Sequence, residues 1–179
     1  MARRNAGIVL ALMATALPPL VAAQSKPVEL GIDGGFEYKV NSPTDLTLGL
    51  PIQSFRVGFP AGRTVSIEPN VTFNYVKVEA TPSFLQFRPE LGVLLHFSSE
   101  TNRSRGFFRP FVGATFSHIG SGGGSANQFY VGGGVGVKVP LNVSRLAARF
   151  EGGVRHGFEG DFASATSIYA LFGFSFFTR

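Results

Sequence analysis

The sequence predicts an all-β fold of one domain, an eight-stranded antiparallel up-and-down β-barrel. Three observations predict it. Apolar and polar residues alternate with a period of two along almost the whole chain after residue 27, which is typical of strands with two unlike faces. No segment beyond residue 23 has the period of a helix, and turn-rich stretches separate eight extended segments. Eight strands are enough to close a barrel without a free edge.

The first 23 residues form a separate unit. They begin with the basic pair Arg3-Arg4, continue through an apolar stretch at 8–17 and end on the small-residue site Val21-Ala22-Ala23. A membrane-spanning helix needs about 20 predominantly apolar residues, which exceeds this stretch. We therefore interpret residues 1–23 as a secretory signal peptide cleaved after Ala23, and residues 24–179 as the barrel domain. An uncleaved N-terminal anchor is the alternative.

Composition narrows the class of protein. Without Arg3 and Arg4 the chain keeps 16 − 2 = 14 basic residues against 11 acidic ones, and the basic residues are scattered rather than clustered, which argues against nucleic acid as a partner. Cysteine is absent, so disulfides and cysteine-ligated metals are excluded. Charged residues make up 15% of the chain, against roughly 25% in soluble domains, and 19 residues are Phe. So few charged side chains would not cover the surface of a water-soluble domain.

Two strands are predicted before residue 60. In residues 28–40 the even positions are mostly apolar, while Glu29, Asp33 and Glu37 stand on the odd, polar face. After the turn-rich residues 41–45, a second extended stretch reaches Phe59, with Arg56 on its polar face. Its early half, around Pro51, is irregular.

A tight turn at 60–63 leads into two further strands. The third begins at Val65 and carries Glu68 on its polar face. Beyond Tyr75 its apolar phase slips to Val76 and Val78, which suggests a bulge. The fourth strand, residues 83–97, places Arg88, Glu90 and His96 opposite an apolar row.

Four strands follow in the second half of the chain. The fifth alternates from Phe108 to Ser117, with Arg109 on its polar face, and a flexible glycine-rich loop at 120–125 follows it. The sixth, residues 129–139, carries three glycines and Lys138 on its polar face. The seventh, residues 146–155, carries Arg149, Glu151 and Arg155, whereas the eighth, residues 166–177, carries no charge.

Alternation alone does not say which face looks outward, because a soluble lipocalin-like barrel would bury its apolar face. The low charge content and the uncharged eighth strand argue against that alternative. A basic side chain facing lipid at mid-depth would cost about 2–4 kcal/mol, whereas charges of both signs can pair inside a lumen. We therefore predict a transmembrane barrel, in which Gly132, Gly134 and Gly136 leave room for longer lumen side chains. The predicted lumen charge network is Glu29, Asp33, Glu37, Arg56, Glu68, Arg88, Glu90, Arg109, Lys138, Arg149, Glu151 and Arg155.

Several short motifs carry a family resemblance. The segments Arg56-Val57-Gly58-Phe59, Ser66-Ile67-Glu68-Pro69 and Arg109-Pro110-Phe111-Val112-Gly113-Ala114, together with a Phe-rich last strand, resemble the small outer-membrane β-barrel domain family of the OmpA/OmpX type, eight-stranded barrels of the porin family. The resemblance covers essentially residues 28–177. It implies a place in the outer membrane of a Gram-negative cell envelope and insertion by the barrel-assembly machinery, which reads an aromatic C-terminal strand.

In this chain the aromatic assembly signal would be Phe172, Phe174 and Phe176. The chain departs from the family pattern at its end, because it continues through Phe177-Thr178-Arg179 instead of stopping at a terminal Phe. Tryptophan, common in interfacial girdles, is also absent.

If the chain were a lipid-modifying enzyme, its catalytic base would have to be one of the three histidines. His156 is followed by Gly157-Phe158, so the His-x-Ser-Asn pattern of lipid A deacylase barrels is missing. His118 adjoins Ser117, but neighbours on a strand point to opposite faces. His96 lies on the lumen phase and fits an interior polar network. No metal-ligand spacing joins the three, and the glycines at 132–136 lack the strand-to-helix context of a phosphate-binding loop, so no cofactor or metal is expected.

The resulting hypothesis is an outer-membrane barrel with a structural or interaction role, a charge-plugged lumen, and loops at 41–51, 80–82, 118–127 and 158–165 facing outward. Outer-membrane lipids and, during insertion, the barrel-assembly machinery are the expected partners. A lipid-modifying enzyme using His96 or His156, a narrow channel and a soluble periplasmic binding barrel are the alternatives. The sequence identifies no ligand, protein partner or oligomeric state.

Overall fold

A computed structural model describes residues 27–40, 46–76, 84–99, 103–119, 124–141 and 145–178. These residues form a closed barrel in which each strand pairs with the next one along the chain and the last pairs with the first. The strands are β1 (Glu29–Lys39), β2 (Leu46–Pro60), β3 (Val65–Val76), β4 (Phe84–His96), β5 (Arg105–Ile119), β6 (Ser125–Pro140), β7 (Leu146–Gly157) and β8 (Ala165–Phe177). All pairings are antiparallel, so the predicted fold class is confirmed.

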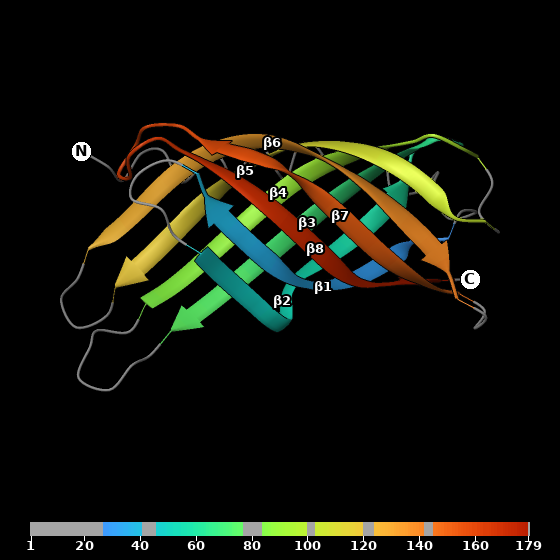
Figure 1. Ribbon diagram of the computed structural model, residues 1–179, viewed down its shortest axis with the longest axis horizontal. Helices are drawn as coiled ribbons and strands as arrows, with labels where there is room; N and C mark the ends of the chain where they lie inside the picture. The colour runs from blue at the N-terminus through green and yellow to red at the C-terminus, as the bar shows by residue number, and fades with distance from the viewer. Residues whose placement is uncertain are drawn as a thin grey trace.

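The strands run obliquely around a single wall (Figure 1). The β2–β3, β4–β5 and β6–β7 connections lie at the same end as the start of β1 and the end of β8, which we call the termini end. The other four connections lie at the opposite end, the loop end. Among the described residues no helix is long and apolar enough to cross a membrane.

The wall closes between β1 and β8. Each residue of β1 from Glu29 to Lys39 has a partner on β8. Beyond the ladder, the Thr178 amide donates to the Val28 carbonyl and the Val28 amide donates to the Thr178 hydroxyl, both at 2.9 Å. The barrel therefore has no edge at its point of closure.

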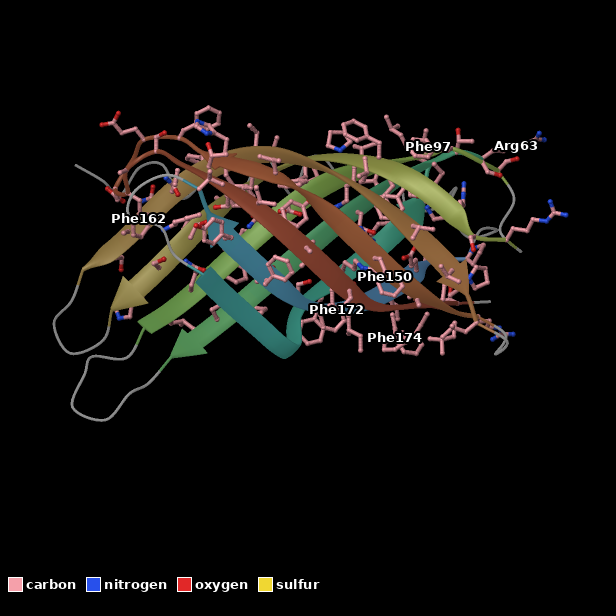
Figure 2. The ribbon with its side chains drawn as sticks, in the orientation of Figure 1. Arg63, Phe97, Phe150, Phe162, Phe172 and Phe174 are labelled. Carbon is pink, nitrogen blue, oxygen red and sulfur yellow. The ribbon has the colours of Figure 1, made fainter. Side chains whose placement is uncertain are left out.

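Alternate residues face the outside and the lumen, and the outside is the apolar face. Val135 is 60% exposed, while its neighbour Gly134 faces inward and is buried. Figure 2 shows Phe150, Phe172 and Phe174 projecting away from the wall, and these residues are about half-exposed. Charged side chains are instead buried inside, which is opposite to the arrangement of the soluble alternative.

The largest difference between the predicted strands and the structure lies at β2. The loop expected at 41–51 is wrong in its second half, because Leu46–Pro51 belongs to β2. The irregularity expected around Pro51 is confirmed by a shift in register: Asp33 pairs with Ser54, but Gly35 pairs with Gly49. Four residues of β2 thus stand opposite Gly34, and the strand bends midway (Figure 1).

One other loop and the expected bulge also differ from the prediction. The loop expected at 118–127 is shorter, because β5 continues to Ile119 and β6 begins at Ser125. The β3–β4 register is unbroken as far as the pair Val76 and Phe84, so the bulge expected after Tyr75 is absent up to Val76. Residues 77–83 and the expected signal peptide, 1–23, lie outside the described residues.

Candidate functional site: the lumen ion-pair network

The lumen brings together six carboxylates and six cations, which we call the lumen network. Strands β1 to β7 supply them, because each residue lies on the inward phase of its strand. The carboxylates are Glu29, Asp33, Glu37, Glu68, Glu90 and Glu151, and the cations are Arg56, Arg88, Arg109, Lys138, Arg149 and Arg155. These are the twelve residues that the alternation assigns to the lumen. Their formal charges balance.

A ring of four side chains forms the centre of the network. Glu68 receives Arg149 Nη1 at 2.6 Å and lies 3.0 Å from Arg109 Nε. Arg109 and Arg149 also both contact Glu151, the former at 3.3 Å. All four side chains are at most 2% exposed. Each charge in this ring therefore has two opposite neighbours in place of water.

An inner arm extends from the ring toward the termini end. Arg56 lies 3.6 Å from Glu68 and forms shorter pairs with Asp33, at 2.7 Å, and Glu29, at 2.5 Å. Its guanidinium also donates to the Ser175 hydroxyl at 2.8 Å, which ties β8 to the network although that strand has no charge. Lys138 ends this arm through its pair with Glu29.

An outer arm extends toward the loop end. Glu90 contacts Arg109 of the ring and lies 3.2 Å from Arg155. Arg155 pairs with Glu37 at 2.8 Å, and Glu37 pairs with Arg88 at 2.6 Å. All twelve groups are thus connected in one continuous series of ion pairs, which the sequence could not show.

Aromatic rings share the lumen with these charges. The Arg149 guanidinium lies 4.7 Å from the centre of the Phe107 ring, and Arg109 lies 4.9 Å from that of Phe111. Tyr169 donates to Glu151 at 2.8 Å, and Arg155 lies 4.7 Å from the Tyr130 ring. Tyr130 and Tyr169 are both buried on the inward phase of their strands. Phe107, Phe111 and the buried Leu94 were missed in the sequence analysis, although all three lie on the inward phase of their strands.

The glycines of β6 make room mainly for these rings. A Cβ atom at Gly136 would lie 2.4 Å from the Phe107 ring, and one at Gly132 would lie 2.3 Å from Phe111. At Gly134 it would meet the Tyr169 hydroxyl at 2.4 Å and Glu151 at 3.0 Å. The sequence predicted space for long side chains at these positions, and the structure shows that the space is filled mainly by aromatic side chains of β5 and β8.

The charged side chains of the lumen network occupy the interior of the barrel. An eight-stranded barrel has an interior just wide enough for side chains. A cavity of about 20 Å³ remains beside the outer arm, lined in part by Ser54, Asn70 and Thr72, and it has room for about one water molecule. Burial of ions costs several kcal/mol each, and removing one partner of a buried pair costs about 3–5 kcal/mol, so the charges stabilise this packing only together.

The three histidines lie apart. His96 is buried in the lumen, where it contacts the Ser66 hydroxyl at 3.4 Å and the edge of Phe107. His156, on the outward phase, contacts the Thr166 hydroxyl at 2.9 Å. His118 contacts the hydroxyl of Ser125, at 3.2 Å, rather than that of Ser117. In the part of the chain that the structure describes, no carboxylate bonds to the His118 ring to complete a triad, and no cluster of potential metal ligands occurs.

Comparison with known proteins identifies the fold. No model of a known protein family matches the chain, and no curated protein sequence matches it significantly. Several solved structures superpose on most of it, among them the following three. Neisserial surface protein A matches with a TM-score of 0.62 and 10% identity over 83% of this chain and 96% of its own. Ail, the attachment invasion locus protein of Yersinia pestis, matches with a TM-score of 0.53 and 8% identity over 86% and 99%.

The third is the N-terminal β-barrel domain of Pseudomonas aeruginosa OprF, with a TM-score of 0.51 and 12% identity over 84% of this chain and 98% of that one. The closed, all-antiparallel topology and these likenesses define one class of fold. The chain has the fold of the small eight-stranded outer-membrane β-barrels.

Proposed function

We propose that this chain is an integral outer-membrane β-barrel protein with a structural or interaction role, and that the lumen network closes its interior to diffusion. One observation carries the proposal: the polarity of the wall is inverted, with apolar side chains outside and a charge-balanced, ion-paired interior. Monomeric soluble proteins rarely expose contiguous apolar patches larger than a few hundred Å². Here the apolar outer face extends over every strand.

The dimensions of the wall support a membrane location. A spanning strand needs roughly 9–11 residues when tilted. The strands contain 11 to 16 residues, which leaves room for polar ends beyond the hydrocarbon. Exposed aromatic side chains lie at both ends, Phe97 at the termini end and Phe162 at the loop end (Figure 2), as expected of interfacial girdles. Outer-membrane lipids are thus the proposed partner of the outer face.

Export and assembly complete the proposal. Residues 1–23 would direct secretion, with cleavage after Ala23, and the barrel-assembly machinery would then insert the barrel. The side chains of Phe172, Phe174 and Phe176 support this step because they form an outward-facing aromatic row on the last strand. The proposal assigns no catalytic role to the chain.

Expression of the full chain in a Gram-negative host tests the proposal. We expect the protein in the outer-membrane fraction, with a gel mobility that changes on boiling because a closed barrel resists detergent until heated. A periplasmic product whose mobility is the same before and after boiling would contradict it and favour a soluble binding barrel.

Conductance in planar bilayers tests the closed lumen. We expect no stable conductance steps, because the lumen network fills the interior. Stable steps that change in Arg88→Gln or Glu90→Gln would contradict the plug and favour the narrow channel.

A further inference from the structure

The connections at the termini end carry an excess of positive charge. In the described residues, each of the three connections there has an exposed arginine: Arg63, Arg103 and Arg145. The sequence of the same three connections contains a single acidic residue, Glu100. A basic rim therefore surrounds this end of the barrel.

The loop end has no such excess. Its exposed charges in the described segments are one cation, Lys39, and two carboxylates, Glu159 and Asp161. In a bilayer the two ends would face different leaflets, and barrels of this class have their short turns on the periplasmic side. The shortest connection of the barrel, 61–64, belongs to the termini end, so we place the basic rim at the inner leaflet.

Two cationic residues of the rim are in direct contact. The guanidinium of Arg105, the first residue of β5, donates from Nη2 to the Arg63 carbonyl and from Nε to the Ser98 carbonyl, both at 2.6 Å. Arg105 thereby ties the β2–β3 turn to the β4–β5 turn. Neither Arg63 nor Arg105 forms an ion pair with a carboxylate of the described residues. Their charges are thus available to an anion from outside the chain.

An exposed aromatic residue adjoins this pair. Phe97 is 71% exposed, the largest value among the described large apolar side chains. Backbone hydrogen bonds fix its place between β3 and β5, because the Phe97 amide donates to the Gly106 carbonyl at 3.0 Å and the preceding His96 amide donates to the Thr64 carbonyl at 2.7 Å. Figure 2 shows Phe97 close to Arg63 at the termini end.

We call Arg63, Phe97 and Arg105 the rim cluster. Girdles of aromatic residues in membrane barrels lie where the hydrocarbon meets the head groups. With Phe97 in such a girdle, the two arginines beside it lie at the depth of the head groups. A ligand that satisfied all three residues would have an anionic group for the guanidiniums and an apolar part for the ring. A soluble anion or a hydrated polymer would leave Phe97 exposed to water.

We propose that the rim cluster binds an anionic phospholipid of the phosphatidylglycerol type. This inference rests on the proposed function, because it requires the outer face to lie in a bilayer. The lipid phosphate accepts hydrogen bonds from the Arg63 and Arg105 side chains, and an acyl chain packs against Phe97. Guanidinium groups bind phosphate oxygens through two parallel hydrogen bonds, which favours this head group.

Two spin-labelled lipids test the site in phosphatidylcholine nanodiscs that hold the full mature chain. One probe is phosphatidylglycerol and the other is phosphatidylcholine, each with a nitroxide at the same acyl position near the head group. Both ends of the barrel meet the same lipids, and the readout is the broadening of backbone amide signals. We expect the phosphatidylglycerol probe to broaden Phe97 about tenfold more strongly, with no such preference at Phe162 of the loop end. An equal ratio of the two probes at both ends would overturn the proposal.

Substitutions of one charge test the role of the arginine. Arg63→Gln should lower the preference at Phe97 about threefold, because it removes one of the two cations near the lipid phosphate. The described contact of Arg63 is through its backbone carbonyl, so the fold should be unaffected. Lys39→Gln is the matched control, since it removes an exposed positive charge at the loop end, and it should leave the preference unchanged. Equal preferences in the two variants would overturn the proposal.

Soluble ligands test whether the site is specific to a lipid. Glycerophosphoglycerol, the phosphatidylglycerol head group without acyl chains, should leave the amide shifts of Arg63 and Phe97 unchanged in phosphatidylcholine nanodiscs. Saturable shifts with this compound would overturn the lipid assignment and indicate a site for a free phosphate. Saturable shifts with acidic peptidoglycan fragments would overturn it in favour of a cell-wall surface.

The nanodisc samples also distinguish this inference from the proposed function. A chain that enters nanodiscs with the dispersed amide spectrum of a closed barrel, yet shows no lipid preference at Phe97, contradicts the phospholipid site alone. A chain that stays outside the nanodiscs as a folded soluble protein contradicts both.

Discussion

The inner and outer faces of the wall are built from the same strands by opposite rules. On β6, Val135 projects outward and is highly exposed, while Lys138, three residues along, is buried and paired inside. Outside, each side chain needs only to be apolar, because its surroundings are uniform. Inside, each charge needs a partner at a particular place. The comparison teaches that substitutions on the outer face should depend on polarity, and those on the inner face on geometry.

The largest expected effect comes from removing a charge at the centre of the lumen network. Glu68→Gln removes a charge that contacts three arginines of the lumen network. We expect a loss of about 3–5 kcal/mol in the free energy of unfolding, because Arg56, Arg109 and Arg149 stay buried with one anionic partner fewer. Urea unfolding in lipid vesicles, followed by gel mobility, measures it. Glu159→Gln, on the exposed β7–β8 loop, is the control, and an equal loss in both variants would refute the role of the centre.

Placing a charge on the outer face should lower the free energy of unfolding nearly as much. Val135→Arg places a cation on the apolar surface, with an expected loss of about 2–4 kcal/mol if that surface faces the middle of a bilayer. Leu141→Arg, at the termini end, should cost about 0–1 kcal/mol. The same unfolding measurement in vesicles compares the two. A harmless Val135→Arg substitution would show that the outer face does not contact lipid.

The geometric rule of the inner face can be tested without any change of charge. Gly136→Ala would bring a Cβ within 2.4 Å of both the Phe107 ring and the Phe150 carbonyl, whereas the nearest atom to a Cβ at Gly152 lies 3.7 Å away. We expect Gly136→Ala to destabilise the barrel by about 1–3 kcal/mol through overpacking. Gly152→Ala should change the free energy of unfolding by less than about 0.5 kcal/mol. Equal effects would show that the lumen can repack around a methyl group.

The smallest expected effect lies at the outer end of the lumen network. Arg88→Gln should lower the free energy of unfolding by about 1 kcal/mol, because this pair is more accessible to water than the ring and Glu37 keeps Arg155 as a second partner. Chemical unfolding of Arg88→Gln alongside Glu68→Gln measures the gradient from the ring to the outer arm. A loss at Arg88 as large as that at Glu68 would mean that the network is uniformly tight.

The sequence determines the two faces well and the contacts between them poorly. Alternation places Glu68, Arg109 and Arg149 on the inward phase, because a strand has a strict period of two. It does not indicate that these three meet, because contacts across a barrel depend on strand tilt and stagger. The bend in β2 was only partly foreseen: Pro51 marked an irregularity, but the end of the β2–β3 ladder depends on how four residues are accommodated opposite Gly34.

The histidines show the same limit. In the sequence His118 adjoins Ser117, whereas in the structure it contacts Ser125 of the next strand. A hairpin register decides that contact, and the glycine-rich loop between the strands gives little indication of the register. The lumen position of Phe107 and Phe111 follows from phase alone, since each lies two residues from Arg109 on the same strand.

The meeting of Val28 and Thr178 has a consequence for the order of the chain. Because Val28 and Thr178, at the two ends of the barrel, are hydrogen-bonded neighbours, a short linker could join them, and new ends could be opened in the exposed β2–β3 turn at 61–64. Such a circular permutant would keep every strand neighbour while starting at β3 and finishing at β2. The wall is a closed ring of eight strands, so the natural order of the strands along the chain is one of several orders that would give the same set of strand pairs.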